Sequence, residues 1–134
     1  MSPRTVNVLV CELQGHRIAL ELNAISSVLA FEEAQPMRQL DPAPYLLGTA
    51  DEPNLLVPPN DDDRMALLDL PGPPTAVRIG QVLGAQQWTA DDLIALPRWI
   101  TQMLPEVFEP ACAWMDQKVV WLLNLDTLNQ NPPA

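Results

Sequence analysis

The sequence predicts a mainly β protein, and three observations support this prediction. Proline occurs 15 times in 134 residues, where roughly 7 would be usual, and a proline inside a helix removes a hydrogen bond and clashes with the preceding turn. Apolar and polar residues alternate over short stretches, as they do in half-buried strands. A hairpin-like pattern also occurs twice, 57 residues apart. A helical bundle is therefore excluded.

The composition limits both the domain organisation and the classes of partner. Hydrophobic residues make up 48% of the chain, which is too much for wholesale disorder, and the length fits one domain covering 1–134. We expect order over about 6–128 and a loose tail at 129–134. The 17 acidic and 7 basic residues give a formal net charge of −10, which argues against nucleic acid and anionic membrane surfaces as partners.

The first two predicted hairpins follow from period-two patterning around turn residues. In the first, Val6–Leu13 and Arg17–Leu22 flank a turn at Gly15. In the second, Met65–Leu70 and Thr75–Ile79 flank a turn rich in proline and glycine. Two such runs around a glycine-containing turn are typical of an antiparallel pair.

A third hairpin is predicted near the C-terminus. Its arms are Phe108–Trp114 and Lys118–Leu125, and its turn is at Asp116 and Gln117. Before it, Thr89–Asp92 has the spacing of a capping box, which predicts a short helical turn.

The region from 36 to 60 is rich in proline, so no long helix passes through it. Two short apolar runs within it, Tyr45–Gly48 and Leu55–Val57, predict brief strands. The run Asp61–Asp63 predicts a solvated loop, because calcium loops space their ligands at alternate positions around a glycine.

The first two hairpins resemble one another. Glu12–Gly15 and Asp69–Gly72 share the pattern acid-Leu-x-Gly, and Ala19–Leu22 and Ala76–Ile79 share Ala-aliphatic-charge-aliphatic. Either strand hairpins converged on this pattern by chance, or the chain contains two similar β-subdomains.

The sequence offers little catalytic or metal-binding chemistry. It has one histidine, His16, and two cysteines, Cys11 and Cys112, with no paired metal-ligand spacing and no glycine-rich phosphate loop. We therefore expect no catalytic residue, no metal and no cofactor. No apolar stretch approaches the ~20 residues that span a bilayer, and the start lacks the pattern of a signal peptide. We accordingly expect no membrane insertion, a cytoplasmic location and unpaired thiols; an enzyme with a cysteine nucleophile is the alternative to a binding module.

The order of several short segments carries a family resemblance. The segments are Leu9–Leu13 with Gly15, Ile18–Leu20, Val28–Leu29, Pro44–Ala50, Ala76–Gly84, Asp91–Leu93 and Val120–Leu128. In this order they resemble the CheW-like family, the coupling proteins of bacterial chemosensory arrays.

The resemblance implies both a fold and a function. The fold would be two small SH3-like β-barrels that share a core, with short helices. The function would be that of a non-enzymatic adaptor between the cytoplasmic tip of a methyl-accepting chemoreceptor and a histidine kinase, with other CheW-like proteins as further partners. The receptor tip would dock near the groove between the barrels, where the candidate residues are Ile25, Val28, Leu29, Val82 and Leu83. The same five residues are equally compatible with plain core.

The chain departs from the family pattern in its first half. An ungapped alignment places the family's Asn-Leu-Arg-Gly motif on Asp51, Glu52, Pro53 and Asn54. Pro53 cannot replace the five donors of an arginine, Ser27 stands where a glutamate is common, and the first barrel is shortened around 54–64. We infer from this that kinase binding is weakened or lost while receptor binding is kept, as in divergent coupling proteins of gliding-motility systems. The alternative is a small β-barrel interaction module outside chemosensory arrays.

Overall fold

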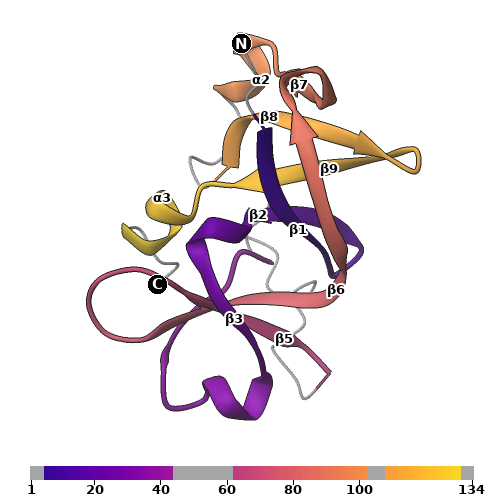
Figure 1. The fold of residues 1–134 in the computed structure, drawn as a ribbon. Helices are drawn as coiled ribbons and strands as arrows, with labels where there is room; N and C mark the ends of the chain where they lie inside the picture. Colours follow the sequence, from indigo (N-terminus) through magenta and orange to yellow (C-terminus); the bar gives the residue numbers. More distant parts are fainter. Residues whose placement is uncertain (1–4, 44–61, 103–107, 131–134) are drawn as a thin grey trace.

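The computed structural model describes residues 5–43, 62–102 and 108–130 and confirms the mainly β fold (Figure 1). Nine strands pair in the order β3-β5-β6-β1-β2-β9-β8-β7, and β4 pairs with β6 beside this path. The strands are β1 (Thr5–Leu13), β2 (His16–Glu21), β3 (Ile25–Ala30), β4 (Arg38–Leu40), β5 (Arg64–Leu68), β6 (Thr75–Thr89), β7 (Leu93–Ala95), β8 (Phe108–Met115) and β9 (Lys118–Leu123). The helical elements are η1 (Leu22–Ala24), η2 (Phe31–Ala34), η4 (Ala90–Asp92), α2 (Arg98–Thr101) and α3 (Leu125–Gln130).

The first and third predicted hairpins are present with tight turns. In the β1–β2 hairpin, Gln14 and Gly15 have φ values of 51° and 83°, and in the β8–β9 hairpin Asp116 and Gln117 have φ values of 50° and 64°. Positive φ at both central residues is what a type I′ turn requires, and the twist of this turn matches that of the strands. The predicted turn at Thr89–Asp92 is also confirmed as η4, in which the Thr89 amide donates to Asp92 Oδ2 over 2.8 Å.

The second hairpin is present, but its second strand is much longer than predicted. The sequence pattern placed the end of this strand at Ile79. In the structure β6 is 15 residues long and ends only at Thr89. It passes through Gly80, which has a φ of +74°, and a Cβ atom there would clash with the carbonyl oxygen of Glu12. Glycine therefore allows the strand to change direction and continue where a side chain would have stopped it.

The two halves of the chain have matching strand registers at an offset of 57 residues. Val8 lies opposite Glu21, and Met65 opposite Arg78. The bulges match as well, since the register shifts past Ser26 in β3 and past Leu83 in β6. These matches favour two similar β-subdomains over chance similarity: the described residues contain two equivalent three-strand units, β1-β2-β3 and β5-β6, in which the two parts of β6 take the places of β2 and β3.

Each three-strand unit contributes its third strand to the other sheet. The β1–β2 hairpin belongs to one sheet, while β3 pairs with β5 in the other. The first part of β6 pairs with β5, while its second part returns to pair with β1. Within the described residues the chain therefore crosses between the sheets at η1 and again at Gly80, and Figure 1 shows β6 passing from β5 up to β1.

The two halves of the chain also correspond in a parallel strand pairing. β4 runs parallel to the first part of β6, and β9 runs parallel to β2, at corresponding positions. After each added strand a polar side chain caps the following turn: Asp41 Oδ1 accepts from the Ala43 amide, and Asn124 Oδ1 accepts from the Thr127 amide. The second cap begins α3, which ends at Gln130. The loose tail predicted for 129–134 stays a prediction, and residues 131–134 lie outside the described residues.

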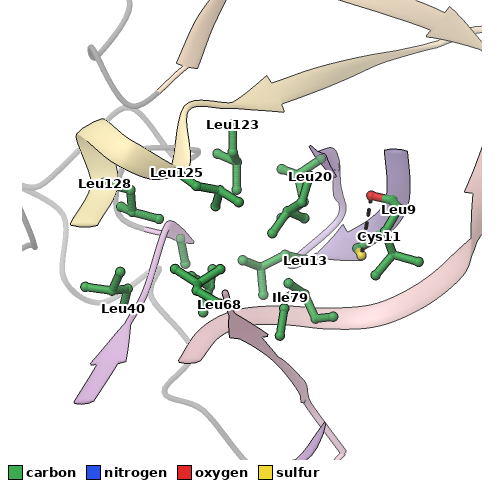
Figure 2. Close-up of a cluster of buried hydrophobic side chains, with 14 of the residues drawn as sticks. Leu9, Cys11, Leu13, Leu20, Leu40, Leu68, Ile79, Leu123, Leu125 and Leu128 are labelled. Atoms are coloured by element: carbon green, nitrogen blue, oxygen red, sulfur yellow. Dashed lines mark hydrogen bonds between the residues drawn. The ribbon is translucent and has the colours of Figure 1, made fainter. Parts of the chain in front are cut away.

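The largest hydrophobic cluster, here called the shared core, lies between the two sheets. Figure 2 shows the leucines of β1, β2, β9 and α3 pointing toward those of β4 and β5 and toward Ile79 of β6. Its buried members are Leu9, Cys11, Leu13, Ile18, Leu20, Leu40, Ala43, Ala66, Leu68, Val77, Ile79, Phe108, Leu123, Leu125 and Leu128. Two smaller clusters lie on the outer sides, one against β1, β2, β8 and β9 and one against β5 and β6.

Several predictions fall outside the described residues. These are the brief strands Tyr45–Gly48 and Leu55–Val57, the motif positions 51–54, and most of the shortened region 54–64. They remain predictions.

Candidate interaction site

Three of the five residues predicted for a groove are exposed. Val28 is 43% exposed, Val82 40% and Leu83 43%, whereas Ile25 and Leu29 are half-buried and pack against the hydrophobic clusters. A lone exposed aliphatic side chain is ordinary. Val82 and Leu83, however, are consecutive, so two large apolar side chains are exposed together on β6.

The register shows which of these residues share a side. Ile25 lies opposite Leu68 and Val28 opposite Ala66, and both partners belong to the shared core. Val82 lies opposite Cys11, which is also a member. Directly opposite residues project from the same face of a sheet. Ile25, Val28 and Val82 therefore all border the shared core.

The other two predicted residues lie elsewhere. Leu29 pairs with Met65 and packs in the small cluster on the outer side of its sheet, because neighbouring residues of a strand point to opposite faces. Leu83 is the extra residue of the bulge in β6. Three of the five, Ile25 and Val28 on β3 and Val82 on β6, thus project from sheet faces that border the shared core, a margin here called the rim between the two sheets. Ser27 is exposed in β3, opposite Leu67.

Sequence reasoning missed a second group of exposed apolar residues. Ile94 lies opposite Cys112, which lies opposite Trp121, so these three form a row across β7, β8 and β9. Trp114 projects from the same face as Cys112, two residues further along β8. No sequence signal separated these residues from core, because Ile94 and Trp114 both stand between apolar neighbours. Ile94 is 49% exposed and Trp114 is 59% exposed in this group, and Trp99 of α2 is a further exposed apolar residue at 66%.

A buried ion cluster joins β4, β5 and β6. Arg78 is 2% exposed, and its Nε donates to Asp63 Oδ2 over 3.0 Å while its Nη1 donates to Asp41 Oδ2 over 3.1 Å. Two carboxylates thus accept from one guanidinium, a geometry that arginine suits through its fixed fork of donors. The prediction that Asp61–Asp63 is simply a solvated loop is wrong for Asp63, and Asp61 lies outside the described residues.

At the position equivalent to Arg78 the first half of the chain carries Glu21. Glu21 lines a hollow of about 130 Å³ together with Glu109 and Asp126. Burial, and then the negative charges of Glu21 and Asp126, raise the pKa of Glu109. Within the described ranges no group of three histidine, cysteine, aspartate or glutamate side chains could hold a metal ion.

Both thiols are free and buried. Burial raises the pKa of Cys11 to about 12, and its Sγ donates to the Leu9 carbonyl over 3.9 Å (Figure 2). Burial also raises the pKa of Cys112. Because the thiolate is the nucleophile, a raised pKa suppresses reactivity rather than activating it.

Comparison with known proteins identifies a similar fold. No protein-family model matches the sequence, and no curated protein matches it either. Among solved structures, the chain is similar to the crystal structure of the scaffolding protein CheW from Thermoanaerobacter tengcongensis, with a TM-score of 0.62 and 13% sequence identity over 92% of this chain and 90% of that chain. The likeness shows a CheW-like fold. In the part of the chain that the structure describes, no helix is long and apolar enough to cross a membrane.

Proposed function

We propose that this protein is a non-enzymatic adaptor of a chemosensory array. The observation that carries the proposal is the CheW-like fold over nearly the whole chain, since the similar structure is that of a scaffolding protein. The buried, unactivated thiols add support, because they weigh against the alternative of a cysteine enzyme. In this proposal the protein is cytoplasmic and needs no cofactor.

The rim between the two sheets is the proposed docking site for the cytoplasmic tip of a methyl-accepting chemoreceptor. Ile25, Val28 and Val82 border the shared core there, and Val28 and Val82 keep about two-fifths of their surface exposed. A helical receptor tip offers apolar residues at helical spacing, which suit a hydrophobic groove. Leu83 extends this surface along β6, whereas Leu29 contributes only to packing.

Kinase binding is proposed to be weakened. The support is in the sequence: Pro53 stands where the family motif has arginine, and Asp51 and Glu52 precede it. The test is a pull-down of the full chain against a receptor signalling tip and a kinase regulatory domain side by side. We expect retention of the receptor tip and little retention of the kinase domain. Kinase-domain binding as tight as that of an intact coupling protein would contradict the proposed loss.

Replacing Val28 with arginine should separate docking from folding. Because Val28 is exposed, we expect the V28R protein to unfold at nearly the same urea concentration as the parent chain, within about 0.5 kcal/mol. Its retention of the receptor tip should fall at least about tenfold, because a charge then faces an apolar surface.

The matched control is Ile94→Arg, which places the same charge on an equally exposed residue of β7. I94R should bind the receptor tip like the parent chain. Equal losses in both variants would mean that the effect is nonspecific, and loss of the fold in V28R would mean that Val28 is core.

A thiol titration tests the enzymatic alternative. With the pKa of Cys11 at about 12, almost no thiolate exists at pH 8, and the side chain is buried. We expect a disulfide reagent to modify Cys11 only after addition of denaturant. Rapid modification of Cys11 or Cys112 in the folded protein at pH 7 would revive the alternative.

A further inference from the structure

The second part of β6, Gln81–Thr89, is an edge strand among the residues that the structure describes. It pairs with β1 on one side, and the strand order places no described strand on its other side. An edge strand presents a row of backbone donors and acceptors that another extended chain can pair with.

This edge lacks two of the usual protections against pairing, charged residues and proline, and the bulge at Leu83 interrupts it near its start. Soluble proteins blunt their edges with charged residues, with proline or with very short strands. The nine residues from Gln81 to Thr89 contain neither charge nor proline, although 18% of the chain is charged. All residues from Gln81 to Gln87 are exposed or half-buried. Such an edge is suited to accept a strand.

Negative charge lies at both ends of this neutral strand. At its start, Glu12 and Asp62 line a hollow of about 300 Å³ together with Gln81. Just beyond its end, Asp91 and Asp92 are exposed in η4. Eight steps of ~3.4 Å separate Gln81 from Thr89, so the acidic ends lie roughly 27 Å apart along the strand.

We propose that this edge binds an extended peptide strand that is neutral in its centre and basic at both ends. Backbone hydrogen bonds to β6 supply the pairing, and the two acidic ends select the register and the partner. This binding mode differs from the proposed receptor docking because it uses the backbone of β6 rather than apolar side chains, and the two surfaces share Val82 and Leu83.

The charges at the two ends of this edge also argue against a second copy of the chain as its partner. Antiparallel pairing of two identical strands would bring the Gln81 end of each beside the Thr89 end of the other. The acidic end near Gln81 would then lie beside the acidic end at Asp91 and Asp92 of the second copy, and like charges brought together oppose the pairing.

The test uses the full chain and a synthetic peptide with a neutral, threonine- and valine-rich centre of nine residues between two lysine pairs. Hydrogen exchange followed by NMR should show slow exchange appearing at alternate amides of Gln81–Gln87 on addition of the peptide. A peptide with the same residues but N-methylated at alternate positions loses half of its donors and should not bind. A peptide with glutamate in place of lysine should bind at least about threefold more weakly, the effect of one or more lost surface ion pairs.

Asp91→Lys tests the charge at one end. Asp91 makes none of the capping bonds of η4, which come from Asp92, so D91K should keep its fold and weaken peptide binding by about threefold or more. Asp69→Lys makes the same change in an exposed residue between β5 and β6 and should not alter binding. The proposal is overturned if the amides of Gln81–Gln87 are all protected without peptide, if the N-methylated peptide binds equally well, or if both lysine variants behave alike. None of these measurements involves a receptor or a kinase, so they stand apart from the test of the proposed function.

Discussion

The two halves of this chain have the same backbone pairing but place opposite charges at one equivalent position. Arg78 in the second half is buried between Asp41 and Asp63. Glu21 in the first half is exposed at a hollow that it shares with Glu109. Backbone hydrogen bonds and the pattern of apolar residues therefore specify the register in both halves, while the polar position beside them is free to carry different chemistry.

Among the substitutions that test this comparison, removal of the buried Arg78 side chain should have the largest effect on the free energy of unfolding. Arg78→Ala leaves two carboxylates without their donor, and breaking a buried ion pair costs about 3–5 kcal/mol. Glu21→Ala, at the equivalent exposed position, should change the free energy of unfolding by less than about 0.5 kcal/mol. Urea unfolding of the two variants measures both effects. Equal changes would show that Arg78 is not a structural cation.

The crossing at Gly80 should give the next largest effect. Gly80→Ala adds a Cβ atom that clashes with the Glu12 carbonyl oxygen, and it also forces alanine into a positive φ. Left-handed strain of roughly 1–2 kcal/mol and overpacking of about 1–3 kcal/mol should add to a destabilisation of about 2–5 kcal/mol.

Gly72→Ala provides the matched control for the crossing. Gly72 has a φ of +106°, but a Cβ atom there meets nothing within 4 Å. Thermal or urea unfolding should therefore show only the backbone strain in this variant. If the Gly80→Ala protein were as stable as the Gly72→Ala protein, the backbone of β1 at Glu12 would move away from the added Cβ atom without a measurable loss of stability. The predicted clash would then be wrong.

A substitution in the hollow at Glu21 should have the smallest effect on the free energy of unfolding, and the size of this effect depends on pH. The pKa of Glu109 is raised in the folded protein by burial and by Glu21 and Asp126. Its stability contribution is therefore fully present at low pH, where the carboxyl is protonated in both states, and is lost as the pH rises through the folded pKa. We expect Glu109→Gln to be slightly more stable than the parent chain at pH 7 and equally stable at acidic pH, so the size of the effect and not its direction changes with pH. Urea unfolding across this range would contradict the expectation if the variant were less stable at pH 7.

The predicted and unpredicted parts of the fold differ in the range of the interactions behind them. Period-two patterns and turn residues are local signals, so the three hairpins and the capped turn at Thr89–Asp92 were predicted. The continuation of β6 beyond Ile79 was not, because glycine normally ends a strand pattern and the tolerance for Gly80 comes from β1, far away in sequence. The parallel pairing of β4 with β6 left no local signature either.

The candidate site shows the same limit. The sequence marked Ile25, Val28 and Val82 as apolar residues beside the hairpins but did not show that they border one core. It also gave no sign that Asp41 and Asp63 meet at Arg78, since these partners are 37 and 15 residues away from it. Charged residues are predicted to be solvated unless the fold brings a partner to them.

The parallel pairing of β9 with β2 has a consequence for the order in which the protein is made. Arg17 lies opposite Val120, so the ribosome adds about 100 residues, taking roughly 5–20 s, between the first strand of this pair and the second. Throughout that interval one edge of β2 stays unpaired. In a chain built of successive hairpins each strand would find its partner sooner. The nascent chain of this protein therefore needs its unpaired strand edge to be shielded from other chains for a longer time.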